Sequence, residues 1–137
     1  PPPTEIYTLS LHDALPIFLV FGAYLIAYGH VSPGGGFQGG VVFASGAVLI
    51  AMGQGVDSFT SRVSVSTLLA LEAVAFAVIL VVGILGMVFG RGYLGIFLPV
   101  GGGAEGGAPF VIILNILIGL EVGAGVTSLC LALLEER

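Results

Sequence analysis

The sequence predicts an all-α integral membrane domain with about four transmembrane helices. Of its 137 residues, 57% are hydrophobic and only 8% are charged, and the mean hydropathy is +1.17. A water-soluble domain carries about 25% charged residues, because its surface must be hydrated. The apolar residues also gather in long segments, separated by polar or glycine-rich connections. These observations place the chain in a lipid bilayer as a multi-pass protein.

Four apolar segments are the candidate spans. They run from about Ile17 to Tyr28, Gly39 to Met52, Ser66 to Phe89 and Phe110 to Leu134. A spanning helix needs about 20 apolar residues, and the third and fourth segments meet that length. The second meets it if Phe37 to Val56 is helical, and the first only if residues before Pro16 extend it.

The N-terminal stretch "PPPTEIYTLSLHDALPI" differs from the rest of the chain, because it is polar and rich in proline. It lacks the basic region and the small-residue cleavage site of a signal peptide. It resembles translated sequencing-adapter sequence. We therefore expect residues 1–17 to be non-native and residues 18–137 to form a single membrane domain, with the true first helix beginning further upstream.

Two longer connections separate the later spans. Residues 54–65, "QGVDSFTSRVSV", are polar enough to predict a hydrated loop, and residues 90–108 are glycine-rich with an apolar patch at 93–100. Four spans would put Arg62 and Arg137 on one side of the membrane and Arg91 on the other. Because basic residues favour the cytoplasmic side, this distribution favours cytoplasmic termini.

Composition also excludes several function classes. Eight acidic and three basic residues give a formal net charge of −5, which disfavours nucleic acid as a partner. A single cysteine, Cys130, excludes a disulfide framework and a cysteine-based metal site. The sequence has no arrangement of nucleophile, base and acid. It therefore predicts no cofactor, no metal site and no independent enzyme.

The segment "GHVSPGGGFQGG" between the first two spans contains a Gly-x-Gly-x-x-Gly pattern. In a dinucleotide-binding unit this pattern joins a strand to a helix, whereas here both flanking segments fit membrane helices. Proline ends a helix and glycine allows positive φ, so the segment predicts a tight reversal. That role leaves His30, Phe37 and Gln38 unexplained, and Phe37 is expected to be a packing wedge or a subunit contact.

Small residues also predict where helices approach closely. Gly36 and Gly40 are spaced to share one face of the second helix, and Gly119 and Gly123 form Gly-x-x-x-Gly in the last. Asn115 is expected to hydrogen-bond across helices. The predicted structural motif and subunit contact comprises Pro33, Gly34, Gly35, Gly36, Phe37, Gln38, Gly39, Gly40, Asn115, Gly119 and Gly123.

Two acidic residues lie inside apolar segments. Glu121 is near the midpoint of the last span and Glu72 lies inside the third. A charged side chain at the bilayer centre costs about 2.5–3.5 kcal/mol or more, and no basic residue lies within the four segments. Each carboxyl group could be protonated and hydrogen-bonded to a neighbouring helix, could lie on a proton or cation path, or could pair with a basic residue of another subunit. Glu121, Gly125 and Ser128 share a stripe.

His30, at the end of the first span, is the third candidate for a proton path, since histidine titrates near neutral pH. A histidine at the membrane interface is also commonly a hydrogen-bonded structural residue. The sequence leaves both roles open.

The segments "GHVSPGGGFQGGVVFASGAVLIAMG" and "NILIGLEVGAGVTSLCLALL" resemble the MnhB/MrpB family, one of the subunit families of multisubunit sodium/proton antiporters. The resemblance extends over about residues 18–134. It implies a multi-pass subunit of the prokaryotic cell (inner) membrane, with other antiporter subunits, sodium ions, protons and the lipid bilayer as its partners. The large proton-pumping subunits would be other chains.

Two rival functions remain at this point. The chain could be the equivalent antiporter-module subunit of a membrane-bound hydrogenase or a related respiratory complex. It could also be a purely structural membrane scaffold whose acidic residues are protonated.

Overall fold

The computed structural model describes residues 3–31, 34–95 and 107–135, and within these residues the fold is all-helical without strands. The helices are α1 (Pro3–Tyr28), α2 (Gly36–Gln54), α3 (Val56–Thr60), α4 (Val65–Val88) and α5 (Ala108–Glu135). The predicted fold class is therefore confirmed.

Helices α2, α4 and α5 are long and apolar enough to cross a membrane. The apolar part of α1, Pro16–Tyr28, is shorter, but α1 continues upstream through Pro16 as one helix of 26 residues. The first segment thus gains helical length from the residues before Pro16, although its apolar part remains shorter than a span. Three spans and one shorter apolar helix agree with the predicted number of about four.

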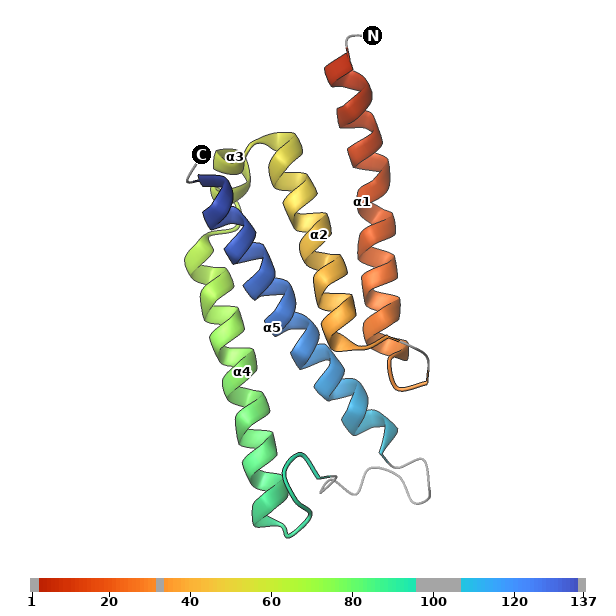
Figure 1. The fold of residues 1–137 in the computed structure, drawn as a ribbon, viewed down its shortest axis with the longest axis vertical. Coiled ribbons are helices and arrows are strands. Elements are labelled where there is room, and N and C mark those ends of the chain that lie inside the picture. Colours follow the sequence, from red (N-terminus) through yellow and green to blue (C-terminus); the bar gives the residue numbers. More distant parts are fainter. Residues whose placement is uncertain (1–2, 32–33, 96–106, 136–137) are drawn as a thin grey trace.

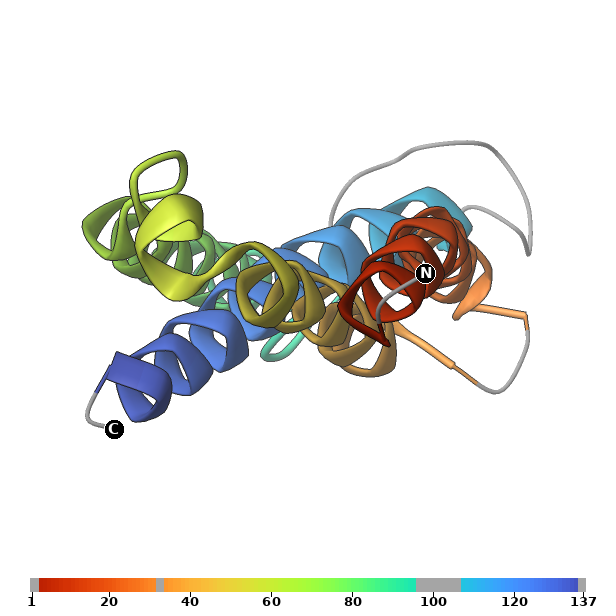
Figure 2. The same ribbon diagram turned by 90° about the horizontal axis from the view of Figure 1, so that it is seen from above.

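Helix α5 lies at the centre of the arrangement. It packs against α2 on one side and α4 on the other, and α1 packs mainly against α2 (Figures 1 and 2). The start of α1, the short helix α3 and the end of α5 lie at one end of the molecule, and the turn that follows α4 lies at the other (Figure 1). Arg62 and Arg91 therefore lie at opposite ends, as expected for residues on either side of a single span.

Glycine and alanine allow α2 and α5 to approach closely. A Cβ atom added to Gly40 would lie 2.7 Å from the carbonyl oxygen of Gly119 and 3.0 Å from the nitrogen of Gly123. The buried face of α2 continues through Ala44 and Ala51. Lipid gives no hydrophobic drive for helix association, so such contacts depend on close van der Waals packing. The two predicted glycine pairs therefore pack against each other.

The connection between α1 and α2 is held to α5 by a side chain. Gly34 and Gly35 have φ of 158° and 145°, and the backbone N–H of Gly36 donates a hydrogen bond of 3.4 Å to Oδ1 of Asn115. Asn115 thus bonds across helices as the sequence predicted, and its Nδ2 atom is buried without a partner among the described residues. Pro33 lies outside the described residues.

The prediction of a simple hydrated loop at residues 54–65 is wrong in part. The segment contains α3, and Phe59 of α3 is only 8% exposed and packs with Ala51 and Leu131. Phe59, with Val56 and Val63 of the same segment packed beside it, docks this short helix onto the ends of α2 and α5. The segment ends at Ser64, whose Oγ caps α4 by accepting from the backbone N–H of Thr67.

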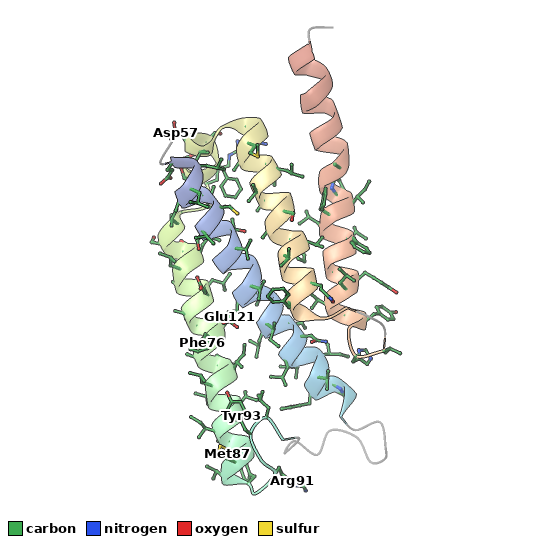
Figure 3. All side chains as sticks on the ribbon, in the orientation of Figure 1. Asp57, Phe76, Met87, Arg91, Tyr93 and Glu121 are labelled. Carbon is green, nitrogen blue, oxygen red and sulfur yellow. The ribbon has the colours of Figure 1, made fainter. Side chains whose placement is uncertain are left out.

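The segment after α4 turns back onto that helix. The ring of Tyr93 occupies the space next to Gly83, and the backbone around Gly92 and Gly95 lies against Gly86 (Figure 3 labels Tyr93). Residues 96–106 lie outside the described residues, and so does most of the apolar patch predicted at 93–100.

Replacing Gly40 with valine should destabilise the α2–α5 contact, because the nearest atoms are two backbone atoms and the Cβ of Val122, none of which can move aside without moving α5. Overpacking of this kind costs about 1–3 kcal/mol. The measurement is denaturant unfolding of the purified protein in detergent. Gly46→Ala is the matched control on α2, since a Cβ there would lie 3.4 Å from Phe18. Equal stability of the two variants would contradict the assigned contact.

Replacing Asn115 with alanine should destabilise the protein by about 1 kcal/mol, because the buried N–H of Gly36 loses its acceptor. Hydrogen exchange at Gly36 should accelerate in the same variant. Unchanged exchange at that amide would show that the hydrogen bond does not hold the turn to α5.

Candidate functional site

A groove of about 640 Å³ runs between α4 and α5. Most of its lining is apolar and comes from both helices, with Phe37 added from the start of α2. Its polar side chains are Glu72, Glu121 and Ser128. The two acidic residues that the sequence places in separate spans therefore line one groove.

Glu121 lies near the middle of α5, on the side facing α4 (Figure 3). Both Glu121 and Glu72 are half-buried within the described part of the protein. Gly119 and Gly123 instead face the residues of α1 and α2, Ile26 and Gly40 among them. The carboxyl groups of Glu121 on α5 and Glu72 on α4 thus lie between these two helices, on the side of α5 away from its glycine contacts with α1 and α2.

The carboxyl group of Glu72 rests against α5 at Gly125. A Cβ atom added to Gly125 would lie 3.0 Å from Oε1 of Glu72 and 3.4 Å from Oε2. The hydroxyl of Ser128 donates a hydrogen bond of 2.9 Å to the carbonyl oxygen of Gly125. Ser128 therefore joins the predicted stripe with Glu121 and Gly125, but its hydrogen is already used, and it offers the groove only oxygen lone pairs.

Basic side chains do not reach this groove within the described residues. Arg62 precedes α4 and Arg91 follows it, so they lie at the two ends of that helix (Figure 3 labels Arg91). Neither carboxyl group has a hydrogen-bond or ion-pair partner among the residues that the structure describes. These residues also contain no group of three or more potential metal ligands. The arrangement is an apolar groove with two uncompensated acids.

A second cavity of about 520 Å³ lies between α1, α2, α4 and α5 and gives a contrast. Its lining is apolar except for Thr127, and the hydroxyl of Thr127 donates a hydrogen bond of 2.6 Å to the carbonyl oxygen of Gly123. This cavity offers a cation or a proton no free acidic group. Of these two cavities, only the α4–α5 groove is lined by acidic side chains among the described residues.

Of the other predicted site residues that the structure describes, only one lines this groove. His30 is exposed at the end of α1, where Nδ1 lies 3.0 Å from the carbonyl oxygen of Ala27, and it is not among the groove residues. Phe37 lines the groove and is 63% exposed. Gln38 is exposed beside it on α2. The sequence did not reveal the contact between Glu72 and Gly125, because the spacing of residues along one helix does not specify which residue of another helix it meets.

Comparisons with known proteins identify the family of this chain. A family model described as "Domain related to MnhB subunit of Na+/H+ antiporter" matches residues 7–128. The match includes residues 7–17 of the N-terminal stretch. The non-native origin of residues 1–17 remains a prediction.

Two relatives illustrate the similarity. An uncharacterized protein, MJ1307, of Methanocaldococcus jannaschii is 33% identical over 130 residues, which cover 88% of this chain and 48% of that protein. A protein of Staphylococcus aureus (strain Newman) named "Putative antiporter subunit mnhB2" is 32% identical over 78 residues, which cover 57% of this chain and 55% of that protein. The chain spans about half the length of the curated relatives it matches.

The family model covers most of the chain, and the helices have the length and apolar composition of membrane spans. This chain belongs to the family of membrane proteins related to the MnhB subunit of Na⁺/H⁺ antiporters.

Proposed function

We propose that this chain is part of a subunit of a multisubunit sodium/proton antiporter in a prokaryotic cell membrane, where it packs against larger subunits and contributes Glu121 and Glu72 to a proton or cation path. The observation that carries this proposal is the convergence of two carboxyl groups from different helices on one groove. Family membership supports the transport reaction, since relatives carry the name of antiporter subunits.

The electrostatics of the groove favour a mobile positive charge. A carboxylate at the bilayer centre is costly by about 2.5–3.5 kcal/mol or more, and the cost is lower when a proton, a hydrated cation or water accompanies it. The described residues supply no base beside Glu72 or Glu121. A proton or a sodium ion that binds in the groove would neutralise the negative charge of a carboxylate. Alternate binding of the two cations at the same acids is what sodium/proton exchange requires.

The exposed apolar surface supports assembly with larger subunits. Among the described residues of α4, the buried ones are Ala75, Gly83 and Gly86, while Val74, Phe76 and Val81 are at least half exposed. Lipid or neighbouring membrane helices must cover this surface, because water does not solvate it well. We propose that larger antiporter subunits cover part of it.

His30 has a separate place in this proposal. It is exposed at the turn that follows α1 rather than in the groove, so it would exchange protons with solvent at the end of the path. The two groove acids carry the proposal, and His30 is secondary to them.

Glu121→Gln in the full-length protein, assembled with its partner subunits, should lower sodium-driven proton exchange at least about tenfold, because glutamine keeps the size of the side chain and cannot carry a proton; tenfold corresponds to about 1.4 kcal/mol. Proton uptake into vesicles is measured over a range of pH. Glu135→Gln, at the exposed end of α5, is the matched control. Full exchange by the Glu121 variant in an intact complex would leave a structural scaffold as the function.

Glu72→Gln should lower exchange as well, and combining it with Glu121→Gln should add little. Two groups on one path act as a unit, so their losses are not additive. The same vesicle assay on the two single variants and the double variant gives this comparison. Losses that multiply in the double variant would assign the two acids to independent roles.

A further inference from the structure

We infer that Gly125 is a positioning residue for Glu72. Because Gly125 has no side chain, the Glu72 carboxyl group can reach from α4 to the surface of α5 that carries Glu121. This inference rests on the proposed function, since it says how the second acid reaches the path. It concerns the geometry of the acids rather than the stability of the helix pair.

The surroundings of Gly125 differ from those of the packing glycines. At Gly40 an added Cβ would meet backbone atoms of α5, so that glycine brings two helices together. At Gly125 the three nearest atoms all belong to the Glu72 carboxyl group: Oε1 at 3.0 Å, Cδ at 3.1 Å and Oε2 at 3.4 Å. The space that a side chain at residue 125 would take is therefore occupied by the Glu72 carboxyl group and not by the backbone of a neighbouring helix.

The location of Gly125 on α5 gives this contact a consequence for the path. Residues four apart on a helix lie on one face, separated by about 6 Å along the axis at 1.5 Å per residue. Gly125 is four residues after Glu121, so the Glu72 carboxyl group rests about one turn from the backbone position of Glu121. A side chain at residue 125 would push the Glu72 carboxyl group outward and away from that wall.

The end of a glutamate side chain is flexible, so a methyl group at residue 125 moves the carboxyl group without breaking the fold. Alanine is also a better helix former than glycine by about 1 kcal/mol. Gly125→Ala should consequently leave stability and assembly intact or improved while it displaces Glu72. A residue that acted only in packing would give the opposite result.

The test is sodium-driven proton exchange by the full-length protein in its complex, reconstituted in vesicles. Gly125→Ala should raise the apparent KM for sodium or shift the pH profile, and the exchange rate should fall by up to about tenfold. A misplacement of about 1 Å can cost about a hundredfold in rate, so a tenfold loss corresponds to a smaller displacement of the carboxyl group. Gly123→Ala adds the same methyl group on the opposite face, 3.5 Å from the carbonyl oxygen of Gly40, and should leave the profile unchanged.

A second readout is independent of transport: labelling of Glu72 by dicyclohexylcarbodiimide, followed by mass spectrometry, should change several-fold in Gly125→Ala, while Glu121 labelling serves as the internal reference.

The outcomes separate the two proposals. A wild-type profile and wild-type Glu72 labelling in Gly125→Ala, together with impaired exchange in Glu72→Gln, would overturn the positioning role and leave the proposed function standing. Full exchange in both Glu72→Gln and Glu121→Gln would overturn the proposed function and the positioning role with it. An equal loss in Gly123→Ala and Gly125→Ala would identify a packing effect and would also overturn the positioning role.

Discussion

The close approach of α2 to α5 is the contact on which the remaining structure depends. In lipid, two helices associate only if their surfaces come close enough for van der Waals contact, and Gly36 and Gly40 lack the side chains that would collide with the backbone of α5. Helix α1 then attaches to α2 by the same means, since a Cβ at Gly39 would lie 2.8 Å from the carbonyl oxygen of Gly22. Close packing of α1, α2 and α5 thus depends on glycine residues at the helix contacts.

This scaffold fixes the direction in which the acids face. At 100° per residue, Gly119 and Gly123 lie within about 40° of each other around α5, whereas Glu121 lies roughly 200° from Gly119. The packing of Gly119 and Gly123 toward α1 and α2 therefore turns Glu121, Gly125 and Ser128 to the opposite side, where α4 lies. Helix α5 consequently packs against α1 and α2 with one face and presents its polar residues to the groove with the other.

The sequence predicts the fold class correctly and reveals two acids inside apolar segments, because each observation depends on residues close together in the chain. Apolar length locates the later spans, and an acid in an apolar run is visible without coordinates. Two features were not predictable in this way. Phe59 docks a short helix inside a polar segment, and the Glu72 carboxyl group meets Gly125 across two helices. Both depend on how separate helices are placed in space, which periodicity along one helix does not specify.

Helix α4 is the element whose placement decides the shape of the groove. Its start packs through Val65 and Leu68 against the cluster around Phe59, and its end is covered by the Tyr93 turn. Between these two contacts its main neighbour is α5, and the acid of α4 lies directly at that contact. The groove is therefore bounded by one helix that belongs to a glycine-packed scaffold and by one whose main helix neighbour is α5. Because the two acids that line the groove have no basic partner among the described residues, the width of the groove and its acidic character depend on the same pair of helices.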